Sequence, residues 1–154
     1  MKSDIYKDAI ICFYFSSNQQ KAEFLVYGNK RGFQYFIDEC MKFKNELWEE
    51  YKEHYHLRDK NSPRIYDGKK MKSQSLTLWP SSEQNISIKL VGWSHAPDIE
   101  CSQNGIDDLC QKIKNYIEEE SNDRPLVLEV PAGLHSRKGQ GLPKKGFLQF
   151  VLKS

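Results

Sequence analysis

The chain lacks the features that identify membrane proteins and disulfide-stabilised exported proteins. No stretch of it approaches the ~20 consecutive apolar residues that a membrane-spanning helix needs. The N-terminal residues contain only a short apolar run and no small-residue cleavage site, so they do not predict a signal peptide. Cys12, Cys40, Cys101 and Cys110 form no Cys-x-x-Cys pair. We therefore expect reduced thiols and a cytoplasmic protein.

The signatures of the large enzyme classes are also missing. The sequence has no G-x-S-x-G, H-E-x-x-H, EF-hand, kinase or dinucleotide-binding pattern. Its glycine-rich segment at residues 133–146 does not have the order of a P-loop, and a strand pattern follows it. A phosphate site at a helix N-terminus is therefore excluded there. We expect a non-enzymatic protein and predict no cofactor.

Acidic residues are absent from the last 24 residues, so the charge is distributed unevenly along the chain. Residues 131–154 carry +5, so with a total of +2 the remaining residues 1–130 carry −3. Such an asymmetry favours a basic patch that faces an acidic surface, either a protein or a nucleic acid. We predict the partner-binding residues to be His135, Arg137, Lys138, Lys144 and Lys145.

The length of 154 residues and an aromatic content of 12% suffice for one core, so we predict a single compact domain over residues 1–154. Residues 9–15 and 22–28 are predicted as a strand hairpin. Asn29 is an expected N-cap for an amphipathic helix whose apolar residues recur at three and four as far as Tyr51. Residues 53–59 follow as a short extended segment.

Residues 74–79 and 85–93 alternate apolar and polar side chains and are predicted to form a second hairpin. Residues 94–105 are expected to be a loop. A second helix is predicted over residues 106–117, and strands over 125–130 and 146–154 surround the basic loop. The order β-β-α-β-β-β-α-β-β predicts an α+β fold. We expect a mostly antiparallel sheet of six to seven strands with both helices on one face.

Two histidines, His54 and His56, are spaced two residues apart. On a strand this spacing puts both imidazoles on the same side, as the start of a zinc or iron site requires. A catalytic metal needs at least a third ligand, which the sequence does not identify. The alternative is a pair of surface histidines beside Tyr55.

A nucleic-acid function remains open as the second hypothesis. His135 lies beside Ser136, Arg137 and Lys138, so it could act as a general acid or base while the cations hold phosphate. A nucleic-acid-binding or metal-dependent nucleic-acid-processing protein would then use residues 135–145 together with His54 and His56. The simpler interpretation of residues 135–145 is a flexible basic hairpin that recognises a partner.

Residues 22–79 contain three short motifs in a characteristic order. They are "GNKRGF", "HYHL" and "SLTLW", and the matching positions are Gly28, Asn29, Gly32, His54, His56, Leu57, Ser75 and Leu76. In this respect the chain resembles the immunity proteins of bacterial polymorphic toxin systems. The resemblance implies a protein that binds a cognate toxin in the cytoplasm of the producing cell and neutralises it by occlusion, without membrane contact.

Overall fold

The computed structural model describes residues 5–17, 22–47, 54–61, 65–66, 69–70, 75–81, 88–93, 96–119, 124–135 and 144–153. Its main sheet has eight strands: β1 (Ile11–Ser17), β2 (Ala22–Gly28), β3 (Tyr55–Arg58), β6 (Ser75–Pro80), β7 (Ile88–Trp93), β8 (Ala96–Cys101), β9 (Leu126–His135) and β10 (Lys145–Leu152). The helices are α1 (Lys30–Lys42), which continues into a π-helical turn η1 (Phe43–Leu47), and α3 (Gln103–Glu118). A separate ribbon pairs β4 (Ile65–Tyr66) with β5 (Lys69–Lys70).

The main sheet is mixed and nearly closed into a barrel. Its order is β1-β2-β10-β9-β7-β8-β6-β3, with parallel joints between β2 and β10, between β9 and β7, and between β8 and β6. The two edge strands approach at one point, where Ile11 and Lys60 exchange two backbone hydrogen bonds of 2.9 Å. The α+β class is confirmed, whereas the prediction of six to seven mostly antiparallel strands is corrected to eight strands in a mixed sheet.

Two local predictions in the middle of the chain are wrong. Residues 74–79 and 85–93 do not form a hairpin, because β8 lies between β6 and β7 and pairs with both. Residues 94–105 were expected to be a loop, yet they contain β8 and the start of α3. Pro97, Asp98 and Glu100 are residue types that strands disfavour. All three pair with β7, and Glu100 also pairs with β6, so tertiary pairing overrides that preference here.

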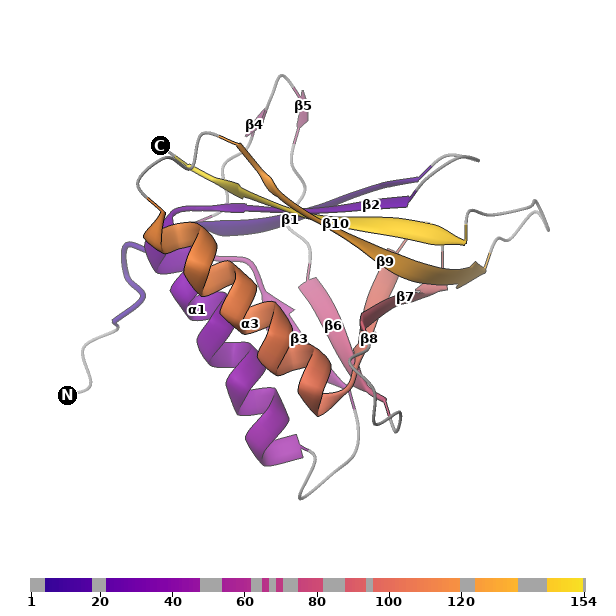
Figure 1. Ribbon diagram of the computed structural model, residues 1–154. Coiled ribbons are helices and arrows are strands. Elements are labelled where there is room, and N and C mark those ends of the chain that lie inside the picture. The colour runs from indigo at the N-terminus through magenta and orange to yellow at the C-terminus, as the bar shows by residue number, and fades with distance from the viewer. Residues whose placement is uncertain are drawn as a thin grey trace.

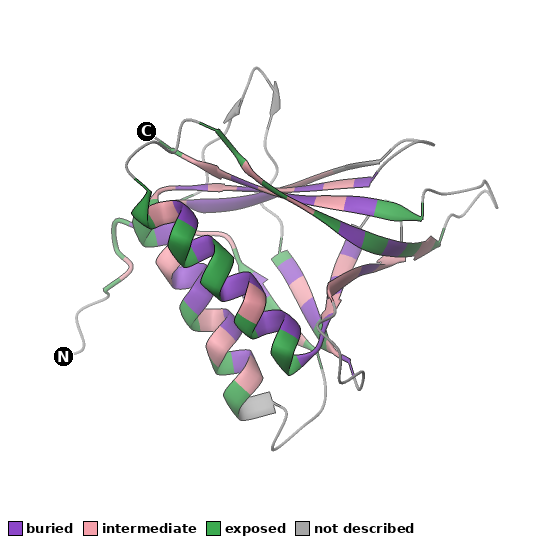
Figure 2. Cartoon of the chain, viewed as in Figure 1, coloured by how far each residue is buried: buried purple, intermediate pink, exposed green. Residues whose placement is uncertain are grey.

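Both helices pack against the same face of the sheet, which we call the inner face (Figure 1). They run antiparallel, because Phe33 near the start of α1 contacts Tyr116 near the end of α3. The core forms where the inner face meets the helices, as the buried residues in Figure 2 show. Phe36 lies 5.8 Å from Phe150 of β10 and 6.4 Å from Phe13 of β1, measured between ring centroids.

The predicted helices are confirmed in position, and the first differs at its end. Asn29 caps α1, as predicted, by accepting a hydrogen bond from the Gly32 amide. The α-helical hydrogen-bond pattern ends at Lys42 and a π-helical turn continues to Leu47, so the last predicted turn to Tyr51 lies outside the described residues. None of the helices in the described ranges is long and apolar enough to cross a membrane.

The chain contains two halves of the same topology. The series β1-β2-α1-β3-β6 and β7-β8-α3-β9-β10 occupy equivalent places, and exchanging them leaves the circular strand order unchanged. An offset of 73 residues relates α1 to α3, so the cap pair Asn29 and Gly32 corresponds to Ser102 and Gly105. Four buried apolar residues of each helix follow the same offset: Phe33, Phe36, Ile37 and Cys40 correspond to Ile106, Leu109, Cys110 and Ile113. We infer an internal pseudo-twofold arrangement.

The G-N-x-x-G motif at residues 28–32 has a structural role in this arrangement. Asn29 accepts hydrogen bonds from the amides of Gly32 (2.8 Å) and Ile10 (2.9 Å) and donates one to the Asp8 carbonyl (2.9 Å). A Cβ atom on Gly28 or Gly32 would lie 2.3 or 1.9 Å from the Ile10 carbonyl oxygen. Both glycines are needed because the backbone before β1 passes directly against the start of α1.

Candidate functional site

His54, His56 and two of the predicted partner-binding residues, His135 and Lys145, lie on the same face of the sheet. Side chains alternate between the two faces of each strand, so the buried residues Leu57, Leu76, Leu78, Ile99 and Leu148 mark the inner face. Their neighbours along the strands point to the opposite side, which we call the outer face. His54, His56, His135 and Lys145 all belong to the outer face.

An exposed cluster of aromatic rings lies at the β3 end of the outer face. The imidazoles of His54 and His56 are 4.7 Å apart in an edge-to-face arrangement, which confirms that their spacing puts them on one side. The His54 ring also lies 4.7 Å from the indole of Trp79 on β6. Trp79 remains 38% exposed, so this cluster presents aromatic surface to solvent. We call His54, His56 and Trp79 the aromatic cluster.

Polar side chains of neighbouring strands hold the aromatic cluster in place. The Trp79 Nε1–H donates a hydrogen bond of 2.8 Å to Oδ2 of Asp98 on β8. His56 Nδ1 lies 2.9 Å from the hydroxyl of Thr77, its register partner on β6. The indole and one imidazole are therefore anchored to side chains of regular strands, an arrangement that lowers the entropy lost when a partner binds.

The structure brings together the two candidate metal ligands that the sequence predicted, the imidazoles of His54 and His56. Within the described ranges, no group of three or more His, Cys, Asp or Glu side chains is arranged to hold a metal ion. The Nδ1 atom of His56 is already in contact with Thr77. A metal site at His54 and His56 stays a prediction, because two candidates for the third ligand, Glu53 and His95, lie outside the described residues.

The basic residues gather where β9 ends and β10 begins. His135 closes β9 opposite Trp93, and Lys145 opens β10 opposite Pro131. The Lys144 carbonyl accepts a hydrogen bond of 2.8 Å from the Ala132 amide, which continues the β9–β10 ladder. The predicted hairpin pairing of these two strands is confirmed. Arg137 and Lys138 lie outside the described residues.

The carboxylate of Glu129 partly compensates the positive charge of Lys145. Lys145 Nζ lies 3.3 Å from Glu129 Oε1, although both side chains are more than half exposed, at 76% and 55%. Exposed pairs of this kind contribute about 0.2–1 kcal/mol and are screened by salt. The pair therefore leaves Lys145 available to a partner that offers a stronger acceptor.

The strand register connects the aromatic cluster to the basic residues in one row. The row crosses six adjacent strands and consists of Lys145, Pro131, Lys89, Glu100, Trp79 and His54. For the β9–β7 and β6–β3 pairs, the strand register is extended by one residue beyond the last paired residues. With strands ~4.8 Å apart, its five steps span about 24 Å along the sheet. Lys145 and Lys89 lie in one half of the row, with Pro131 between them. Glu100, Trp79 and His54 lie in the other half.

Sequence reasoning placed His54 and His56 on one side of a strand but missed their contacts with Trp79 and Thr77. The alternation in "SLTLW" was sufficient to place Thr77 and Trp79 opposite Leu76 and Leu78. No such signal existed for Asp98, because its strand was interpreted as a loop. Comparison of the chain with protein-family models, curated proteins and solved structures gives no significant match.

Proposed function

We propose that this chain is a non-enzymatic protein-binding module, an inhibitor of the immunity type, that occludes a cognate toxin with the outer face of its sheet. The aromatic cluster carries this proposal. Trp79 is exposed, anchored by Asp98 and packed against His54, whose ring also contacts His56. Tryptophan is among the residues that dominate binding energy when it lies near the centre of an interface.

The charge pattern supports a protein partner over a nucleic acid. Glu100 lies in the same row as Lys89 and Trp79, and Asp98 contacts the indole directly. These carboxylates would repel a phosphate backbone that follows the row. A protein partner can match both signs, and such complementarity accelerates association and selects the partner.

A rescue experiment tests the proposal. The partner is captured from the source cells with the wild-type chain, expressed alone to establish toxicity, and then co-expressed with each variant. We expect wild type and Gln111→Ala, an exposed substitution on α3, to restore growth. Trp79→Ala should fail to restore it. A captured protein that is harmless alone, or equal rescue by Trp79→Ala, would contradict the proposal.

A nucleic-acid ligand is the competing outcome, and salt separates it from a protein ligand. If His135, Lys144 and Lys145 neutralise phosphates, binding to single-stranded RNA should fall steeply as salt increases, with a logarithmic slope of about −0.7 per phosphate contacted. We expect no such binding at physiological salt. Tight RNA binding that is lost in Lys144→Ala/Lys145→Ala would replace the inhibitor proposal.

A further inference from the structure

Three of the four cysteines lie together in the core beneath the two helices. Cys40 on α1 and Cys110 on α3 are 1% and 3% exposed, and Cys101 at the end of β8 is 2% exposed. All three belong to the same packed cluster, whereas Cys12 is buried on the outer side of β1, next to Tyr27. None of the four forms a disulfide in the structure.

Cys40 and Cys110 contact each other across the helix interface. The Cys40 thiol donates a hydrogen bond to the sulfur of Cys110, so the two thiols are chemically different. This hydrogen bond, together with burial, raises the pKa of Cys40. The same bond lowers the pKa of Cys110, helped by the charges of Lys114 and Lys44 against the opposing effects of burial and Asp107.

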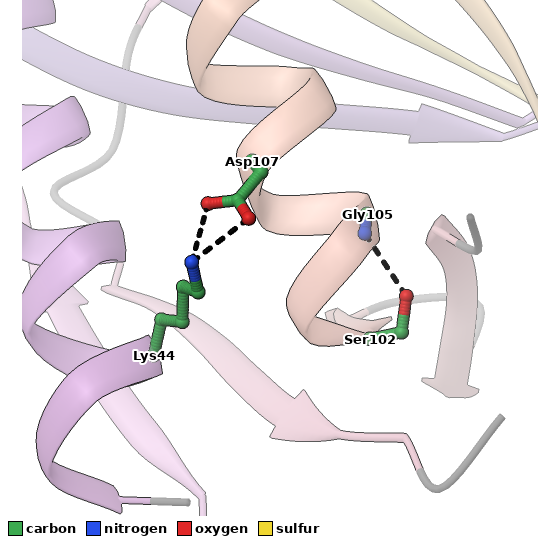
Figure 3. Close-up of polar contacts among 4 residues, drawn as sticks. All are labelled: Lys44, Ser102, Gly105 and Asp107. Atoms are coloured by element: carbon green, nitrogen blue, oxygen red, sulfur yellow. Dashed lines mark hydrogen bonds and ion pairs between the residues drawn. The ribbon is translucent and has the colours of Figure 1, made fainter. Parts of the chain in front are cut away.

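An ion pair between the helices fixes the geometry of this contact. Lys44 Nζ lies 2.7 and 2.8 Å from the two carboxylate oxygens of Asp107, as Figure 3 shows. Lys44 follows Cys40 by one helical turn, and Asp107 precedes Cys110 by about one turn. The ion pair therefore links the two helices about one turn away from each sulfur.

We propose that Cys40 and Cys110 form an oxidation site, at which a peroxide converts the two thiols into an intramolecular disulfide between α1 and α3. Cys110 supplies the attacking thiolate and Cys40 the resolving thiol. The proposal is independent of the protein-binding function, because the pair lies on the helix side of the sheet and the aromatic cluster lies on the outer face.

The reaction balances in two steps. The Cys110 thiolate attacks one oxygen of hydrogen peroxide, the O–O bond breaks, and the departing hydroxide takes a proton to become water. The sulfur of Cys40 then attacks the sulfenic sulfur, the S–O bond breaks, and the released hydroxide takes the Cys40 proton as a second water. Two thiols are oxidised by two electrons in total, and one peroxide is reduced.

The other two cysteines serve as matched controls. Burial is the main cause that raises the pKa of Cys101 to about 12, with the charges of Cys110 and Glu100 adding to it, so it is a poor nucleophile. Cys12 belongs to a different strand face from the pair. We therefore expect Cys101→Ala and Cys12→Ala to leave the reaction intact, and Cys40→Ala and Cys110→Ala to abolish disulfide formation.

The experiment treats the native full chain with hydrogen peroxide and follows mass and free thiols. We expect a mass loss of about 2 Da, reversed by dithiothreitol, and the loss of two of the four thiols. Peptide mapping of oxidised wild type should recover a cross-linked peptide that contains Cys40 and Cys110. This readout needs no variant and so does not depend on how well the alanine variants fold. In Cys40→Ala, a sulfenic acid at Cys110 should be trapped by dimedone.

Three results would overturn the proposal. The first is that all four thiols of the native chain survive peroxide until it unfolds. The second is a disulfide that contains Cys101 or Cys12 in place of either assigned residue. The third is oxidation that yields only intermolecular dimers or sulfonic acids.

Discussion

The indole of Trp79 donates a hydrogen bond of 2.8 Å to Asp98 across the parallel joint between β6 and β8. This contact links two strands that are separated in the sequence by β7. It depends on a topology in which β8 inserts between β6 and β7, and it fixes an exposed ring in one orientation. The aromatic cluster is therefore assembled by the tertiary fold, from strands that are not adjacent in the sequence.

The close approach of Gly32 to Ile10 predicts a severe effect of a small substitution. Gly32→Ala places a Cβ atom 1.9 Å from the Ile10 carbonyl oxygen, so backbone must move. We expect the free energy of unfolding to fall by about 1–3 kcal/mol or more. Gly133→Ala is the matched control, since its Cβ meets only the flexible end of Lys89 at 3.0 Å. Equal denaturation midpoints for the two variants would refute the steric explanation.

Asn29 links the start of α1 to the segment before β1. Asn29→Ala removes the acceptor for the Gly32 and Ile10 amides, and we expect a loss of about 2 kcal/mol, roughly one for the cap and one for the second hydrogen bond. Asn29→Asp keeps the acceptor oxygen and should retain most of the stability. Urea denaturation measures both variants. An Asp variant as unstable as the Ala variant would show that the amide donor to Asp8 matters more.

Much of this local structure follows from the sequence, because it depends on residues close to one another along the chain. Asn29 and the three-and-four spacing identify α1, and two-residue alternation places His54 and His56 on one side. The parallel joints were not predictable in this way. The β2–β10 joint pairs Ala22 with Gly146, and no local pattern reports which distant strands meet.

The inferred pseudo-twofold arrangement could not be recognised from residue identity either. Across the two helices and their caps, the offset of 73 residues preserves the cap glycine and most of the buried positions while the side chains differ. Phe33 becomes Ile106 and Phe36 becomes Leu109, for example. Packing preserves apolar character and approximate volume more strictly than identity. Such a repeat is recognised only when the strand order is known.

The Lys44–Asp107 ion pair predicts a modest, salt-dependent coupling between the helices. A double-mutant cycle with Lys44→Ala and Asp107→Ala should give about 0.5–1 kcal/mol at low salt, because the side chains are 23% and 48% exposed. The matched pair Lys112–Asp108 lies within α3 at 2.8 Å and should give about 0.3–0.5 kcal/mol. A zero coupling for Lys44–Asp107 would mean that the pair does not clamp the helices.

The hydrogen bond between Tyr6 and Asp38 predicts that the protein loses stability in alkaline solution. Its hydroxyl donates to the Asp38 carboxylate, and this bond, with burial and nearby negative charge, raises the pKa of Tyr6 to about 12. The resulting stabilisation is complete below the unfolded pKa of about 10 and is lost as the pH rises towards 12. In urea titrations over this window, wild type should lose more stability than Tyr6→Phe. Parallel curves for the two proteins would contradict the assignment.

The dissociation constant of the captured partner, measured with wild type and Trp79→Ala, tests the central claim most directly. Trp79 is partly exposed, so the variant should stay folded and lose little stability. If the aromatic cluster is the centre of the interface, binding should weaken by about 30-fold or more, which corresponds to at least about 2 kcal/mol. Gln111→Ala should bind as wild type does. A folded Trp79→Ala protein with unchanged affinity would contradict the claim that the outer face binds the partner.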